Sequence, residues 1–289
     1  MKNALLATSL LVCAIAAYAQ SSVTLYGRLD AGIEYMSGLT NAAGSASTSR
    51  WRVEGGDWGT SLWGLKGVED IGNGNKVLFQ LENGFNAVNG NLASAGSLWS
   101  RWATVGVAND SFGTLLLGRE LFISNGLWDF DPLGQSNWSS ASLVRGRNWP
   151  ISSNNISYQS PKIAGFDAYG QYSLSNGTSW NANPGGQGRS DGIQLTYTSA
   201  LFQVRGLYDE IHDPNNGLLD NVFTASREYF VGANVFLGQF KLQGVYQASR
   251  ISGITSSVAG TPTTTNQFWG GLTWQATPAA ALIAAAYHV

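Results

Sequence analysis

The stretch VTLYGRLDAGIEY, residues 23–35, decides the fold of this chain. Every second residue in it is apolar or small, whereas Arg28, Asp30 and Glu34 fall between those positions. Alternation with a period of two places the two sets on opposite faces of a β-sheet. A helix advances by about 100° per residue and would mix the two sets. The stretch therefore predicts a strand with one apolar face and one polar face.

Residues 1–19, just before this strand, have the parts of a secretory signal peptide. Lys2 supplies a positive charge, residues 4–16 form an apolar run, and the A-Y-A sequence at 17–19 fits a cleavage site. The run is shorter than the about 20 residues that a membrane-spanning helix needs. We therefore expect export across the inner membrane and a mature chain that begins at Gln20.

The composition limits the possible classes of function. Charged residues make up 12% of the 289 residues, where about 25% is typical, and the net charge is -2. The single cysteine, Cys13, lies in the segment to be removed, and a lipoprotein anchor at Cys13 is the less favoured alternative. The mature chain then has no thiol for a disulfide, a metal site or a nucleophile. No basic patch suits nucleic acid, so we expect no nucleic-acid partner.

The same alternation predicts strands along the rest of the chain. They cover residues 61–70, 75–85, 155–159, 166–172, 192–198, 201–208, 227–236, 240–249, 265–275 and 279–289. Short turns alternate with long loops, which we place at residues 37–60, 86–98, 121–147, 174–191, 209–226 and 250–264. Strands of about 9 to 12 residues match the length that crosses a bilayer at a tilt, whereas globular strands average about 5 to 6. We therefore predict an all-β, transmembrane antiparallel β-barrel, with a soluble β-sandwich as the alternative.

Four segments resemble the general porins of Gram-negative bacteria, of the kind found in β-proteobacteria. They are SSVTLYGRLDAGIEY (21–35), LWGLKGVEDIGNGNKVLFQLENGF (62–85), FGTLLLGRE (112–120) and NNISYQSPKIAGFDAYGQY (154–172). The resemblance implies a sixteen-stranded outer-membrane barrel, assembled as a homotrimer, with a third loop folded into the pore. It also implies a water-filled channel for ions and small hydrophilic solutes, in contact with outer-membrane lipid and lipopolysaccharide.

The chain departs from this family in its strand number. We expect about thirteen strands in residues 20–289, and the last of them runs to Val289. Bacterial single-chain barrels have an even number of strands. We therefore expect a sequence that lacks about three strands at its C-terminus. The alternative is a smaller barrel of twelve or fourteen strands with a narrower lumen.

The charged positions between the apolar ones are expected to line the pore. They are Arg28, Asp30, Glu34, Lys66, Lys76, Glu82, Arg119, Arg205 and Lys241. An Arg or Lys facing lipid near the membrane midplane would cost about 2 to 4 kcal/mol, which favours inward placement. Around Arg101 and Arg119 the alternation fails, so a position near a strand end is equally compatible with the sequence. For each charge the alternative is a solvated residue or a salt bridge to a neighbouring strand.

Residues 121–147 form a long loop that, by resemblance, constricts the pore. The loop carries Asp129 and Asp131, together with Arg145 and Arg147. Acidic residues on an inward loop that face basic residues on the wall create a transverse field, which sorts solutes by size and charge. Without the resemblance, two aspartates on an extracellular loop would simply indicate a soluble surface.

No arrangement of residues predicts catalysis. The two histidines, His212 and His288, do not lie near a Ser or Asp pattern that suggests a triad. Nucleophile, phosphate-loop, dinucleotide and metal-binding motifs are not found, so we expect neither an enzyme nor a cofactor. The alternative function is a carbohydrate-selective channel or a surface adhesin that uses Trp-rich loops.

Overall fold

The computed structural model describes residues 22–40, 47–144, 151–174, 189–212, 223–254 and 263–289. The predicted signal peptide, Arg145 and Arg147 lie outside these residues. The described part has fifteen strands: β1 (Ser22–Arg28), β2 (Gly32–Thr40), β3 (Ser47–Glu54), β4 (Ser61–Gly72), β5 (Asn75–Phe85), β6 (Trp102–Asn109), β7 (Gly113–Glu120), β8 (Ser152–Gln159), β9 (Phe166–Ser173), β10 (Arg189–Thr198), β11 (Phe202–His212), β12 (Phe223–Leu237), β13 (Phe240–Ile254), β14 (Thr264–Thr277) and β15 (Ala280–His288). No helix among these residues is long and apolar enough to cross a membrane.

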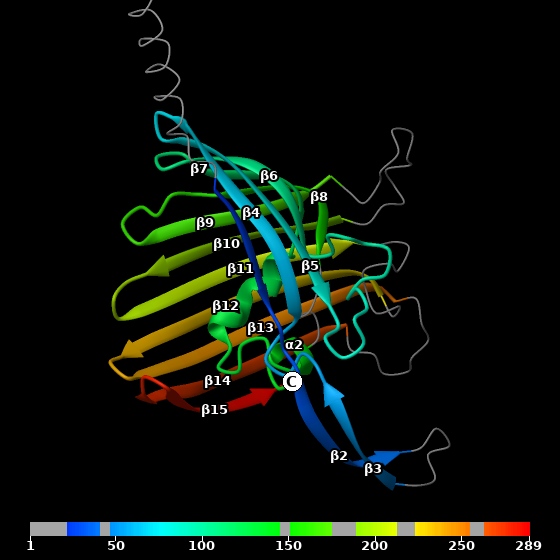
Figure 1. Ribbon diagram of the computed structural model, residues 1–289. Coiled ribbons are helices and arrows are strands. Elements are labelled where there is room, and N and C mark those ends of the chain that lie inside the picture. The colour runs from blue at the N-terminus through cyan, green and yellow to red at the C-terminus, as the bar shows by residue number, and fades with distance from the viewer. Residues whose placement is uncertain (1–21, 41–46, 145–150, 175–188, 213–222, 255–262) are drawn as a thin grey trace, which may run out of the picture.

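Thirteen of the strands form one antiparallel sheet, and β2 and β3 form a separate hairpin. In the sheet β1 pairs with β4, and every later strand pairs with its neighbour in sequence, so β1 and β15 are the two edges. Figure 1 shows the curved sheet and the β2–β3 hairpin that projects from it at the lower right. An all-β, antiparallel architecture is thus confirmed.

The prediction of one continuous strand over residues 23–35 is wrong at its centre. The strand ends at Arg28, and the chain resumes as β2, which pairs with β3 inside the predicted loop 37–60. The cause is Asp30, whose carboxylate accepts hydrogen bonds from the backbone N–H groups of Trp58 and Gly59 at 2.9 and 2.8 Å. These bonds hold the chain in a bend, because they tie residue 30 to the segment that enters β4.

Short and long connections alternate along the sheet. The connections after β4, β6, β10, β12 and β14 have two or three residues, and the one after β8 has six. All of these lie at the same end of the strands, on the left in Figure 1. The connections between β5 and β6 and between β7 and β8 are long and start from the opposite end of the strands. This asymmetry is the one that outer-membrane barrels have.

The distribution of buried residues is the reverse of that in a water-soluble protein. Apolar side chains such as Leu25 and Ile193 are 69% and 60% exposed on the outer face of the sheet. Polar side chains such as Gln247 and Gln267 are 0% and 1% exposed on the inner face. Buried glutamines on one face and a large exposed apolar surface on the other are both unusual in a globular domain. The outer face therefore suits lipid and the inner face suits a polar lumen.

Candidate functional site

Residues 121–144, the described part of the connection between β7 and β8, fold back onto the inner face of the sheet, and we call them the inner loop. It contains the 3-10 helix η2 (Ile123–Phe130) and the short helix α2 (Ser140–Leu143). Helix η2 lies against β11, β12 and β13 (Figure 1). One buried apolar cluster joins Phe122, Ile123, Leu127, Phe130 and Val144 of the loop to Leu207, Ile211, Phe230, Val245, Ile251 and Trp269 of the wall. Burial stabilises a large apolar side chain by about 1.5–3 kcal/mol, so the loop is firmly packed.

Two glycines on the wall make this close packing possible. A Cβ atom at Gly232 of β12 would lie 2.8 Å from Cδ1 of Phe130, and one at Gly271 of β14 would lie 2.7 Å from Cγ of Pro132. Contacts this short force a shift in a densely packed interior. Glycine in the middle of a strand thus marks the places where the loop approaches the wall backbone.

Gly232→Ala is expected to push Phe130 off the wall and to destabilise the protein by about 1–3 kcal/mol. The measurement is the temperature at which the compact, fast-migrating form is lost on gel electrophoresis. Gly244→Ala on neighbouring β13 is the matched control, because nothing lies within 4 Å of a Cβ there. Equal midpoints for the two variants would contradict the close approach.

Three wall side chains hold the backbone of the inner loop at Asp129. Its carbonyl oxygen accepts hydrogen bonds from Asn234 Nδ2 at 3.1 Å, Lys241 Nζ at 3.0 Å and Gln243 Nε2 at 3.0 Å. The next carbonyl, that of Phe130, accepts a bond from the indole N–H of Trp269. The side chain of Asp129 is exposed, so its carboxylate remains available to solutes.

Asp131 has a different environment from Asp129. It is 3% exposed, and its carboxylate accepts hydrogen bonds from Ser140 N at 2.7 Å, Leu133 N at 2.9 Å and Tyr287 Oη at 2.5 Å. These bonds close the loop on itself and join it to β15. The carboxylate of Asp131 is thus used inside the loop, whereas Asp129 is exposed, and a lumen-facing role of Asp129 stays a prediction.

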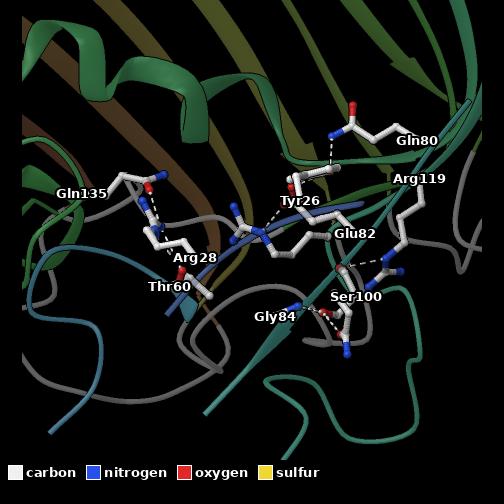
Figure 2. Close-up of polar contacts among 11 residues, drawn as sticks. Tyr26, Arg28, Thr60, Gln80, Glu82, Gly84, Ser100, Arg119 and Gln135 are labelled. Atoms are coloured by element: carbon white, nitrogen blue, oxygen red, sulfur yellow. Dashed lines mark hydrogen bonds and ion pairs between the residues drawn. The ribbon is translucent and has the colours of Figure 1, made fainter. Parts of the chain in front are cut away.

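Arg28 reaches the inner loop from the opposite wall. Its guanidinium donates to the carbonyl of Thr60 at 2.9 Å and to Oε1 of Gln135 at 3.3 Å. Figure 2 shows Arg28 between Thr60 and Gln135. Because Gln135 lies on the inner loop, Arg28 contacts that loop, and its role as a wall cation of the pore stays a prediction.

A buried carboxylate organises the polar wall next to Arg28. Glu82 is 6% exposed and forms a salt bridge with Arg101 at 2.5 Å. Tyr26 Oη donates to the other carboxylate oxygen at 2.9 Å and accepts from Gln80 Nε2 at 2.8 Å (Figure 2). Lys66 adds a cation–π contact, with its Nζ 5.4 Å from the centroid of the Tyr26 ring.

A cavity of about 160 Å³ separates the inner loop from this wall. Wall residues Gly59, Thr60 and Arg101 line one side of it, and loop residues Trp128 and Gln135 line the other. The cavity is wide enough for water and small solutes and carries a guanidinium on its wall. The cavity therefore lies between the inner loop and the polar wall beside Arg101.

Two further predicted cations lie on the inner face near Asp129. Arg205 on β11 donates from Nε to Thr196 Oγ1 at 3.0 Å, and its guanidinium carbon lies 4.9 Å from the Phe130 ring centroid. Lys241 on β13 holds the Asp129 carbonyl, as described above. Both residues therefore flank the tip of the inner loop.

Other predicted residues lie away from the constriction. Lys76 is at the short-turn end of β5 and pairs with Asp110 at 3.1 Å. Glu34 is on the β2–β3 hairpin, outside the thirteen-stranded sheet, where it pairs with Arg52. Neither geometry supports a place at the constriction.

Arg119 lies near the end of β7. It is two residues from Leu117, which is exposed, so the alternation of the strand places both on the same face. Its guanidinium donates to the carbonyl of Ser100 at 3.1 Å and to Ser153 Oγ at 2.8 Å. The register shifts between Gly118 and Glu120, which explains why the alternation fails here. The geometry favours the strand-end position over a pore-lining one.

Sequence reasoning missed two side chains beside the inner loop, Tyr26 and Gln135, and left Arg101 open between the lumen and a strand end. Tyr26 occupies a polar-face position of the first strand, so its parity was a usable signal. Arg101 precedes β6 and Gln135 lies in an irregular segment. Periodicity carries no information at either position. Among the described residues, no cluster of His, Cys, Asp or Glu could hold a metal ion.

A family model described as Gram-negative porin matches residues 4–289. The chain belongs to this family. An outer membrane porin protein of Bordetella pertussis is 34% identical over 266 residues, which cover 85% of this chain and 69% of the relative. Outer membrane porin protein 32 of Delftia acidovorans is 31% identical, covering 86% of this chain and 70% of the relative.

The fold comparison agrees with the sequence comparison. An anion-selective porin from Comamonas acidovorans superposes with a TM-score of 0.70 at 26% identity, covering 93% of this chain and 79% of that one. The porin is thus an outer-membrane β-barrel protein and not an enzyme. Its general function is the passage of ions and small hydrophilic solutes through a water-filled lumen.

Proposed function

We propose that this porin is a diffusion channel that prefers anions. The observation that carries the proposal is the balance of charge around the inner loop. Arg28, Arg205 and Lys241 lie beside the loop, and Asp129 is the exposed carboxylate among them. Arg101 neutralises Glu82, so that pair contributes little net charge. A lumen with excess cations attracts anions at its narrowest point.

A related protein supports the same preference. The superposed porin from Comamonas acidovorans is described as anion-selective. At 26% identity the likeness extends beyond the fold, but the wall charges of the present chain carry the argument. The carbohydrate-selective channel and the adhesin lack a comparable observation in their favour.

The test is conductance of the refolded full-length protein in planar bilayers under a salt gradient. We expect stepwise current increments and a reversal potential on the anion side. Asp129→Asn is expected to increase the anion preference by a few-fold, because a unit charge acts over several ångströms at about 1 kcal/mol or less in water. A folded protein without conductance, or one that prefers cations, would overturn the proposal.

We also propose that residues 1–19 are removed on export and that the mature protein is a homotrimer in contact with outer-membrane lipid and lipopolysaccharide. The sequence supports the first point through the apolar run and the A-Y-A site. The family resemblance supports the second. Native mass spectrometry of the membrane-extracted protein tests both, since it gives the mass of each subunit and the number of copies.

A further inference from the structure

A second cavity lies between the inner loop and the wall formed by β6 to β11. Its volume is about 300 Å³, at the lower limit of the about 300 to 1,000 Å³ that is typical of small-molecule sites. The residues that line it include Trp102, Tyr169, Gln194 and Arg205 of the wall and Phe122 and Trp128 of the loop. Trp128 also lines the cavity beside Arg101, so the two cavities share this residue as a wall.

Aromatic side chains form much of the apolar lining of the second cavity. Trp102 and Tyr169 lie on the wall, and Trp128 lies on the loop. All three are half-buried, so part of each ring remains accessible from the cavity. Aromatic rings attract one another in offset-stacked or edge-to-face arrangements, beyond the gain from burying apolar area. The lining therefore favours a ligand with a planar aromatic group.

Arg205 brings a positive charge into this cavity. Val204 is exposed on the outer face, so the alternation of β11 places Arg205 on the inner face. Its Nε donates to Thr196 Oγ1, and its guanidinium lies over the Phe130 ring. Within the residues that the structure describes, the two terminal nitrogens of Arg205 have no hydrogen-bond partner. A guanidinium that is held in place with its outer edge unused is preorganised to bind a carboxylate.

Gln194 offers a second donor to the same ligand group. Ile193 and Leu195 are exposed on the outer face, so Gln194 points inward from β10, where it is half-buried. In the described part of the chain, its side-chain amide has no hydrogen-bond partner. The register pairs Gln194 with Leu207, two residues from Arg205. Such diagonal neighbours lie about 7 to 8 Å apart, so a carboxylate between them can accept hydrogen bonds from both side chains.

Three carboxylates in or near the cavity limit the negative charge that it can accept. Asp129 and Asp167 are close enough to interact electrostatically with Arg205. Glu120 is 0% exposed, and its carboxylate already accepts a hydrogen bond from Asn155. One negative charge on a ligand is attracted by the guanidinium, whereas a second one would lie against the aspartates. The cavity therefore suits a monoanion better than a dianion.

We propose that this cavity is a transit site for small aromatic monocarboxylates, in which the carboxylate pairs with Arg205 and the ring lies against Trp102 and Trp128. The planar fork of a guanidinium matches the two oxygens of a carboxylate. This inference rests on the proposed channel function, because a solute reaches the cavity through the lumen. It goes beyond a general anion preference, because it requires a ring and a single negative charge in one molecule.

Isothermal titration calorimetry of the refolded full-length protein in detergent tests the site with four probes. Benzoate carries a ring and one charge, benzamide a ring alone, acetate a charge alone, and phthalate a ring with two charges. The heat measured with protein-free micelles is subtracted for each probe. We expect benzoate to bind about tenfold or more tightly than each of the other three, because each of them lacks one favourable contact or adds a repulsive one.

Three variants separate the contribution of the charge from that of the ring. Arg205→Gln is expected to weaken benzoate binding by about tenfold to hundredfold, the range for losing hydrogen bonds to a charged group, and to leave benzamide binding unchanged. Trp102→Leu is expected to weaken benzoate and benzamide by the same factor and to leave acetate unchanged. Lys76→Gln is the matched control, because it removes the same charge at the short-turn end of β5, and we expect it to change none of the four affinities.

Three results would overturn the inference: equal affinity of the wild-type protein for benzoate and benzamide, undiminished benzoate binding by Arg205→Gln, or tighter binding of glucose than of benzoate, which would indicate a carbohydrate site. If Arg205→Gln does not fold, the comparison of benzoate with benzamide on the wild-type protein decides. Conductance is measured in parallel. An anion-preferring channel that does not bind benzoate contradicts this inference alone, and a protein that binds benzoate but prefers cations contradicts the proposed anion preference alone.

Discussion

Replacing both Arg28 and Arg101 with glutamine is expected to lower the chloride-to-potassium permeability ratio by about tenfold or more. Two unit charges about 7 Å apart interact by about 0.6 kcal/mol in water and about 2.4 kcal/mol at an effective dielectric constant of about 20. Loss of Arg101 also leaves the carboxylate of Glu82 without its cation. Because 1.4 kcal/mol corresponds to about tenfold, the removed charges suffice for that change. The measurement is the reversal potential in a salt gradient.

Two matched variants test whether position rather than charge number matters. Lys76→Gln removes a cation at the short-turn end of β5. Strand β4 lies between the two cations: its Asp70 pairs with Lys76 of β5, and its Leu62 pairs with Arg28 of β1. The two cations are therefore separated by eight residues along β4. Eight residues span about 26 Å, beyond the Debye length of about 10 Å, so little change is expected. Glu82→Gln removes a negative charge and should raise the chloride-to-potassium permeability ratio. A fall in this ratio would contradict the proposed anion preference.

Removal of the Asp131 side chain is expected to loosen the inner loop. Asp131→Ala leaves the donors Ser140 N, Leu133 N and Tyr287 Oη without their acceptor. Each buried donor left unsatisfied costs about 1–3 kcal/mol. The apolar cluster still holds η2, so we expect a folded barrel with larger and noisier single-channel conductance. The measurement is single-channel recording at fixed voltage.

Tyr287→Phe is the graded control for this loop variant. It removes one of the three donors to Asp131 and leaves the two backbone donors in place. Its effect on conductance noise should therefore be smaller than that of Asp131→Ala. Identical recordings from the wild-type protein and Asp131→Ala would show that the carboxylate does not hold the loop.

The strand pattern of the sheet could be predicted because it depends on local alternation. The predicted segments 61–70, 75–85 and 166–172 fall within β4, β5 and β9. The bend after Arg28 could not be predicted in this way. It depends on hydrogen bonds between Asp30 and backbone groups 26 to 29 residues later, which no local pattern shows.

The candidate site was predictable to the extent that parity decides which face a side chain occupies. Parity places Glu82, Arg205 and Lys241 on the inner face, and the structure has them there. Whether a charge is free or used internally depends instead on distant partners. The burial of Asp131 needs Tyr287, which is 156 residues away. Pore lining by all of the predicted charges stays a prediction until conductance is measured.

Three hydrogen bonds to the backbone carbonyl of Asp129 fix the path of the inner loop, and this path does not depend on which side chain residue 129 carries. Asn234, Lys241 and Gln243 hold a backbone atom that every amino acid possesses. Among the described residues, the carboxylate of Asp129 makes no hydrogen bond that a substitution would break. Position 129 can therefore vary in charge while the barrel keeps its shape. A single substitution at position 129 is therefore expected to change the charge selectivity of the channel without changing the path of the inner loop.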